Sequence, residues 1–85
     1  MDAQAHTPIA RVEGGPACAA YLCEQLELPV DSIKTYGDLV KTIHLLRDRL
    51  NTEHGETIGA MKYMAHLEEM NTRALASIGG PRTFH

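Results

Sequence analysis

Tyr36 is the residue of this 85-residue chain best suited to bind a planar ligand, because it presents an aromatic ring at the start of a long helical pattern. An aromatic ring offers a stacking platform worth about 1–3 kcal/mol per nucleobase. Lys34 lies two residues earlier, and Arg47 and Arg49 follow about three to four helical turns later. These cations suit phosphates, which arginine binds in a bidentate manner. The opposing interpretation is that Tyr36 only packs against the body of the protein.

A second candidate site lies in the C-terminal tail. Arg82 and Thr83 follow the sequence Gly79-Gly80-Pro81, which is typical of a helix end. A guanidinium, a hydroxyl and free backbone N–H groups together can surround a phosphate. The alternative is a frayed terminus with Phe84 tucked against the helices. Lys62 is a further candidate cation, although a single exposed lysine usually does no more than interact with water.

The sequence carries no catalytic signature, so we expect a protein that is not an enzyme and needs no cofactor. There is no nucleophile elbow, phosphate-binding glycine loop or paired-carboxylate motif. None of the five histidines pairs with another at i,i+4, and no metal site is predicted. Cys18 and Cys23 would point to different faces of a helix, which makes a disulfide between them unfavourable.

Length and charge limit the partners. A chain of 85 residues forms one domain at most, and 44% hydrophobic residues with 22% charged ones are ordinary for a folded protein. A net charge of −3 argues against coating duplex DNA, which requires a basic face. No run predicts a membrane span or a secretory signal. A core with few aromatic residues is thin, which favours assembly into a homo-oligomer.

The predicted fold class is all-α. Residues 1–15 are expected to form a flexible arm, which Ile9 and Val12 could dock onto the body. Residues 16–85 form a single helical domain with a first helix at about 16–27, opened by Pro16 and ended before Pro29. This short helix packs on an antiparallel two-helix hairpin over about 36–78.

The hairpin is predicted from capping and periodicity. Thr35 is the expected N-cap of its first helix, with Asp38 completing a capping box. Residues 51–55 form the expected break, and the second helix runs over about 56–78. A single polar residue, Asn71, lies in its seam. If buried there, it could fix register or oligomer state; the alternative is a solvated position at the edge of the seam. Apolar spacings of three and four predict buried seams at Leu39, Ile43, Leu46 and Leu50, then at Ala60, Met64, Leu67, Asn71, Ala74 and Ile78, widened by Met61 and Leu75.

Two stretches of the chain carry a family resemblance. Residues 33–39, Ile-Lys-Thr-Tyr-Gly-Asp-Leu, resemble the entry motif of the phage anti-CBASS cyclic-nucleotide sponge family, whose helical hairpin is shared with one class of anti-Thoeris sponges. Residues 66–69, His-Leu-Glu-Glu, stand where that family often has His-Leu-Gln-Gln. Ile78, Pro81, Thr83 and Phe84 fall at distances similar to those of the family's ending.

The resemblance implies a specific function. Such sponges are not enzymes; they form homo-oligomers, commonly hexamers, in the cytoplasm of the infected bacterial host. There they sequester cyclic di- or trinucleotide immune signals without cleaving them. Carried over to this chain, Tyr36 would contact a cyclic dinucleotide, and Arg82 and Thr83 would belong to a separate trinucleotide pocket. The family's lysine farther along the helix is absent, since Asn51 stands there, so Arg47 or Arg49 would replace it.

The sequence thus leads to two functional hypotheses. The first is a non-catalytic sponge for a cyclic oligonucleotide. The alternative is a small helical inhibitor, similar to an anti-CRISPR protein, that binds a host defence protein. A helix-turn-helix DNA-binding protein is disfavoured, because neither hairpin helix carries a basic recognition face.

Overall fold

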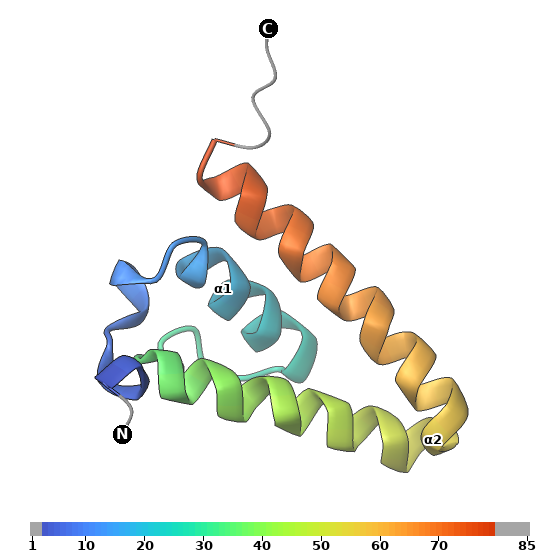
Figure 1. Ribbon diagram of the computed structural model, residues 1–85. Helices are drawn as coiled ribbons and strands as arrows, with labels where there is room; N and C mark the ends of the chain where they lie inside the picture. Colours follow the sequence, from blue (N-terminus) through green and yellow to red (C-terminus); the bar gives the residue numbers. More distant parts are fainter. Residues whose placement is uncertain (1–2, 80–85) are drawn as a thin grey trace, which may run out of the picture.

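The computed structural model describes residues 3–79, which are mostly helical and contain no β-strand. Two 3-10 helices, η1 (Ala3–His6) and η2 (Ile9–Arg11), precede the helices α1 (Gly15–Leu26) and α2 (Tyr36–Ser77). Figure 1 shows α2 folding back on itself, with α1 lying between its two halves. The all-α fold class is therefore confirmed for the described part of the chain.

The bend in α2 is made by Gly55, whose φ of 83° and ψ of 165° are not helical. This backbone region is accessible essentially to glycine alone. The bend divides α2 into an entry arm, residues 36–54, and a return arm, residues 56–77. The expected five-residue break at 51–55 was wrong in its extent, because residues 51–54 are helical and one glycine makes the turn.

The arrangement is a V rather than a closely packed hairpin. The two arms meet at the elbow and spread apart away from it, and α1 lies between them (Figure 1). Leu22 of α1 is fully buried, and its neighbours Tyr21 and Cys23 are each 4% exposed. Burial of three consecutive residues requires partners on more than one side of the helix. The helix α1 thus lies at the centre of the core. The sequence had instead predicted that it packs on an antiparallel two-helix hairpin.

The bounds of α1 agree with the prediction to within one residue. Pro16 occupies the first turn, and Glu27 ends the helix in the left-handed conformation with φ 57° and ψ 46°. The next amide, that of Leu28, donates to the carbonyl of Cys23 at 2.9 Å. The chain then reaches Thr35, the N-cap of the entry arm.

The start and seam of the entry arm are confirmed. The Thr35 hydroxyl accepts from the Asp38 amide at 3.2 Å, and the Asp38 carboxylate accepts from the Thr35 amide at 3.2 Å. These reciprocal bonds form the predicted capping box. The predicted seam faces the core: Leu39, Leu46 and Leu50 are buried, and Ile43 packs against them.

The predicted seam of the return arm was wrong by a rotation of the helix. Met64 is 59% exposed and Ile78 is 45% exposed, although both were expected inside. The side chains that face the core are the predicted Leu67 together with Tyr63 and Met70, which were not predicted, and Met70 is only 4% exposed. Leu67 and Ala74 are half-buried, so they are the two predicted members that lie at the edge of the core. The exposed remainder comprises Ala60, Met61, Met64, Asn71, Leu75 and Ile78.

Residues 3–15 take defined positions against the body. An antiparallel β-bridge joins Pro8 to Thr35. Gly14, with φ 74°, packs so closely on the return arm that a Cβ added to it would lie 2.8 Å from the Cβ of Ala74. Where the sequence predicted a loose arm, the structure thus shows a segment that contacts both arms of α2; its flexibility stays a prediction.

Candidate functional site

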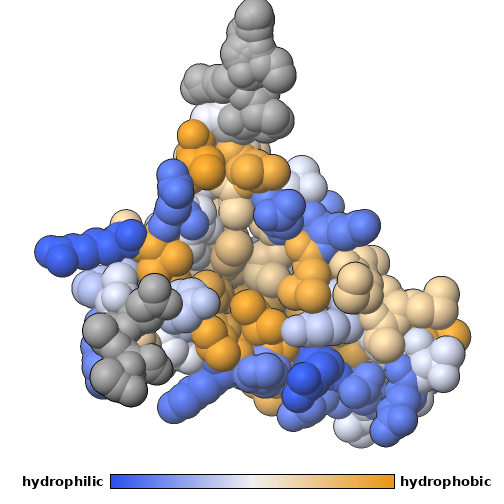
Figure 2. Space-filling view, viewed as in Figure 1, coloured by the Kyte–Doolittle hydropathy of each residue, from blue (hydrophilic) through white to orange (hydrophobic). Residues whose placement is uncertain are grey.

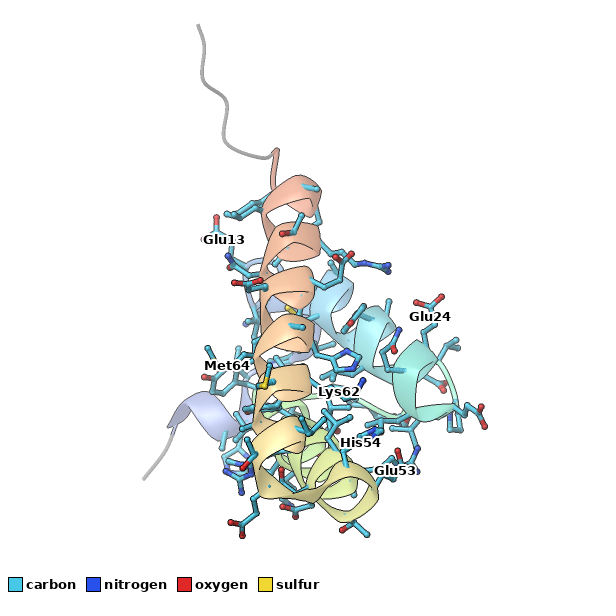
Figure 3. The ribbon with its side chains drawn as sticks, turned by 90° about the vertical axis from the view of Figure 1, so that its right-hand side faces the viewer. Glu13, Glu24, Glu53, His54, Lys62 and Met64 are labelled. Carbon is cyan, nitrogen blue, oxygen red and sulfur yellow. The ribbon has the colours of Figure 1, made fainter. Side chains whose placement is uncertain are left out.

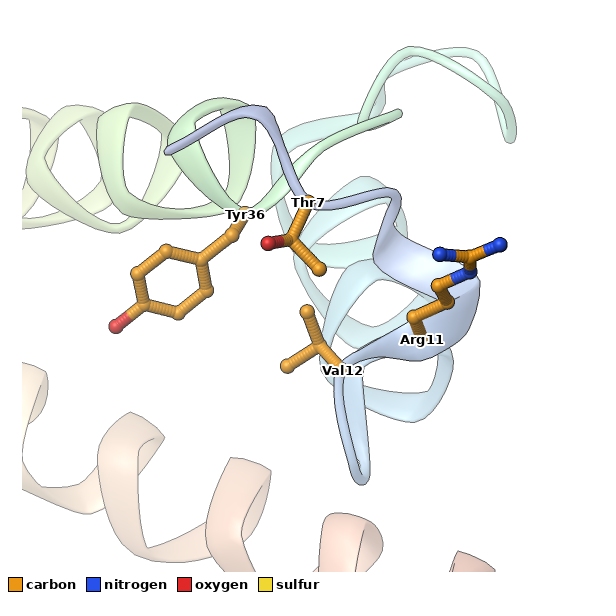
Figure 4. A pocket seen from close by; sticks show the side chains of 4 residues that line it. All are labelled: Thr7, Arg11, Val12 and Tyr36. Carbon is orange, nitrogen blue, oxygen red and sulfur yellow. The ribbon is translucent and has the colours of Figure 1, made fainter. Parts of the chain in front are cut away.

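A cavity of about 270 Å³ lies between the N-terminal segment and the start of α2. It is lined by Thr7, Arg11, Val12 and Tyr36. In the close-up of Figure 4, the Tyr36 ring extends beside the side chains of Thr7 and Val12. The cavity therefore offers an aromatic face, a hydroxyl and an aliphatic wall to a ligand.

Two backbone hydrogen bonds place Tyr36 at this cavity. The Tyr36 amide donates to the Thr7 carbonyl at 2.9 Å, and the Ile9 amide donates to the Lys34 carbonyl at 2.8 Å. They fix the N-terminal segment against the residues that precede α2. Because Tyr36 is the first residue of α2, its half-buried ring leaves the helix at its end.

Arg11 is the cation at the cavity, and the sequence did not single it out. It is the last residue of η2 and is exposed. Figure 4 shows its guanidinium turned away from the Tyr36 ring, so that its aliphatic stem lies nearest the other lining residues. A signal was present, because Ile9 and Val12 were expected to dock the arm and Arg11 lies between them in sequence.

Three basic residues proposed with Tyr36 do not line the cavity. Lys34 is exposed and contributes its backbone carbonyl to the bond with Ile9. Arg47 and Arg49 follow Tyr36 by 11 and 13 residues, which places them roughly 16–20 Å farther along the helix axis. Arg47 lies beside Asp48, with 3.8 Å between Nε and the carboxylate.

The lysine proposed on the return arm is also separate from the cavity lining. Lys62 is exposed on the return arm, where Figure 3 shows it and Met64 on opposite sides of the helix. Arg82 and Thr83 lie outside the described residues. Of the site residues predicted from the sequence within residues 3–79, the structure thus brings only Tyr36 to the cavity.

The N-terminus of α2 is already occupied by its own carboxylate. Backbone N–H groups of Lys34 and Thr35 donate to Asp38 and hold the pKa of its carboxyl below the ordinary value. A negative charge at this helix end is favourable with respect to the helix dipole. A phosphate would have to compete with Asp38 there, so a side-chain cation is the better partner for an anionic ligand.

A second polar cluster joins α1 to the return arm. The Tyr21 hydroxyl lies 2.6 Å from Nδ1 of His66, and the Arg73 guanidinium lies 4.8 Å from the centre of the Tyr21 ring. Arg73 also forms ion pairs with Glu69 at 2.9 Å and with Glu24 at 3.5 Å. Burial is the largest of the effects that raise the pKa of Tyr21. These contacts hold the return arm in the rotation that the structure shows.

Other reactive groups of the described chain do not form a site. Cys23 is buried with its sulfur 3.7 Å from the Ser32 hydroxyl, and burial raises the pKa of the half-buried Cys18 thiol. Residues 3–79 contain no group of three His, Cys, Asp or Glu side chains that could hold a metal ion. Nor does any helix in that range have the length and apolar character needed to cross a membrane.

Comparison of the chain with protein-family models, with curated proteins and with solved structures found no match.

Proposed function

We propose that this protein binds a cyclic oligonucleotide second messenger without cleaving it and thereby acts as a phage anti-defence sponge. The observation that carries the proposal is the position of Tyr36 in a cavity beside an arginine. A nucleobase can stack on the ring, and the Thr7 hydroxyl can donate or accept a hydrogen bond at the base edge or ribose. The resemblance of residues 33–39 to the sponge entry motif supports the same assignment.

Arg11 takes the charge role that the sequence had given to Arg47 or Arg49. Its side chain is exposed and carries rotatable bonds, so its guanidinium can turn from the orientation in Figure 4 toward a phosphate next to a stacked base. Arginine suits this role because its planar group binds phosphate oxygens in a bidentate manner. Lys34 is the nearest further cation in sequence to Tyr36.

The size of the cavity limits what one chain can enclose. Its volume of about 270 Å³ lies just below the range of ligand sites, which span roughly 300–1,000 Å³. It suits one nucleoside unit rather than a whole cyclic di- or trinucleotide. The rest of the ligand would extend beyond it, toward a neighbouring chain of a homo-oligomer such as a hexamer. Arg82 and Thr83, which lie outside the described residues, stay proposed for a separate trinucleotide pocket.

Calorimetric titration with a panel of cyclic di- and trinucleotides tests the proposal. We expect saturable binding by the wild type, at least about a tenfold weaker association for Tyr36→Ala, and a smaller loss for Arg11→Ala. Tyr63→Ala is the matched control, since Tyr63 is a second half-buried tyrosine that does not line the cavity. Ligand recovered after heat denaturation should be chemically intact, whereas a cleaved product would mean an enzyme.

A helical inhibitor of a host defence protein is the second candidate function. The observation that favours it is the exposed apolar surface of the return arm, which includes Met61 and Met64 at 64% and 59% exposure. Tyr36→Ala separates the two functions. A sponge loses its ligand through this substitution, while a protein inhibitor with its interface on the return arm keeps its activity.

A further inference from the structure

The return arm of α2 carries an apolar stripe on the side that faces away from the core. Seven large hydrophobic residues are exposed in the described chain, and four of them, Met61, Met64, Leu75 and the C-cap Ile78, belong to this stripe. Figure 2 shows hydrophobic surface over its last turns, just below the grey tail. Exposed apolar residues concentrated on one helix mark an interaction surface. The stripe defined here consists of Met61, Met64, Glu68, Asn71, Leu75 and Ile78.

The spacing of the stripe is that of a coiled-coil seam. Its members follow one another at intervals of three, four, three, four and three residues. Next to it lie the small exposed side chains of Ala60, Ala65 and Thr72, which permit the close approach of another helix. The charged residues Glu69 and Arg73 lie on a different side of the arm, where they pair with each other and Arg73 also pairs with Glu24 on α1.

The order of residues within the stripe is symmetric about its midpoint. Two apolar residues stand at each end of the stripe, and two polar residues stand at its centre. The midpoint falls between residues 69 and 70. When an identical helix runs antiparallel across this midpoint, each residue meets a different member of the stripe. The opposed pairs are Met61 with Ile78, Met64 with Leu75, and Glu68 with Asn71.

We infer that the return arm pairs antiparallel with the return arm of a second copy of this chain, about a two-fold axis at this midpoint. A two-fold interface requires that residue i meets residue j while j meets i, and the stripe satisfies this condition at every position. The Glu68 carboxylate then accepts a hydrogen bond from the Asn71 amide of the other copy. A parallel pairing would instead oppose Glu68 to Glu68, two like charges in the seam.

The pairing goes beyond ligand binding and does not depend on it. The stripe residues take no part in lining the cavity at Tyr36. Loss of the pairing would therefore leave the proposed nucleotide function open, and failure to bind nucleotides would leave the pairing in place. It also assigns a role to Asn71, for which the sequence had left a buried seam position and a solvated edge position open and which the structure shows exposed.

Sedimentation equilibrium of the wild type and two charge variants tests the pairing. We expect the wild type to dimerise, and Met64→Lys and Leu75→Glu each to weaken self-association by at least about tenfold. Both residues are exposed, 59% and 40%, so each variant should fold, as circular dichroism will verify. Leu45→Lys is the matched control, since Leu45 is 47% exposed on the entry arm and lies outside the stripe.

Mixing the two variants tests the orientation. In an antiparallel pair, the lysine introduced by Met64→Lys faces the glutamate introduced by Leu75→Glu, while the other end keeps its native Leu–Met contact. We therefore expect an equimolar mixture to regain dimerisation that neither variant shows alone. A parallel seam offers no such complementary pair, so a mixture that stays monomeric overturns the antiparallel arrangement.

A cysteine cross-link gives an independent readout. Met64→Cys combined with Leu75→Cys should form intermolecular disulfides, because the two positions face each other across the seam. Met64→Cys alone should not, since two copies of residue 64 would lie roughly 16 Å apart, beyond disulfide reach. A monomeric wild type at about 100 µM that yields no specific cross-link would overturn the inference and indicate that a different protein covers the stripe.

Discussion

The two arms of α2 differ in how their apolar residues are used. On the entry arm, one seam faces inward and the residues Leu39, Leu46 and Leu50 are buried. On the return arm, apolar residues lie on two sides, one facing the core at Met70 and one facing outward at Met64. Hydrophobic periodicity identifies the helix in both arms, but it identifies the core-facing side only where a single apolar side exists.

The largest effect that tests this contrast comes from two methionines of the return arm. Met70→Ala removes a side chain that is 4% exposed and should lower the free energy of unfolding by about 2–5 kcal/mol. Met64→Ala alters one that is 59% exposed and should change it by less than about 0.5 kcal/mol. Urea unfolding at low protein concentration, where self-association contributes least, measures both. Equal costs at the two positions would contradict the observed rotation of the arm.

A smaller effect is expected where the arms meet. A Cβ added to Gly59 would lie 2.9 Å from the Cα of Asn51 and from the carbonyl oxygen of Leu50. Gly59→Ala should therefore destabilise the protein by about 1–3 kcal/mol through overpacking. Glycine to alanine in an exposed helix interior would instead stabilise by roughly 1 kcal/mol.

The sign of the Gly59 effect thus reports whether the elbow is closed as the structure shows. Thr57→Ala is the control, because Thr57 is exposed two residues earlier and should change the free energy of unfolding by no more than about 0.5 kcal/mol. A more stable Gly59→Ala variant in thermal or urea unfolding would mean that the two arms do not approach each other at this position.

The smallest effect concerns the capping box that begins the entry arm. The folded-state pKa of Asp38 lies below its unfolded value, so its ionised form stabilises the fold at pH values above the unfolded pKa. That contribution is lost as the pH falls through the folded pKa. Asp38→Asn keeps an acceptor but removes the charge, so its stability relative to the wild type should be lower at pH 6 and become similar in strong acid.

Unfolding curves of both proteins between pH 6 and pH 2 measure this difference. A difference that does not depend on pH would show that the Asp38 charge contributes nothing to the cap. Asp48→Asn is a suitable control, since Asp48 is exposed within the same arm and belongs to no cap.

Local chemistry explains which parts of the fold could be predicted. Pro16 and the Thr35–Asp38 pair act through their own backbone neighbours, so the start of α1 and of α2 follow from the sequence. The bend also has a local cause in Gly55, although the prediction wrongly assigned residues 51–54 to the break and not to the helix. The rotation of the return arm depends on contacts between distant residues, such as Tyr21 with His66, which no local pattern contains.

The same distinction applies to the candidate site. Tyr36 stood out because of its residue type and its place before a helix. Arg11 and Thr7 reach the cavity through the bonds that tie residues 7–9 to residues 34–36, and such pairing between distant segments is not visible in residue spacing. Arg47, which was expected to bind the ligand together with Tyr36, does not line the cavity, because about three helical turns separate the two residues.

The central claim, that the cavity at Tyr36 holds part of a cyclic oligonucleotide, is tested most directly by isothermal titration of the wild type and Tyr36→Ala with the same ligand panel. We predict nanomolar binding of at least one cyclic di- or trinucleotide by the wild type, which corresponds to about −12 kcal/mol, and a marked loss in the variant with its fold and oligomeric state unchanged. Absence of binding to every member at micromolar concentrations, or equal affinity of the two proteins, would contradict the account.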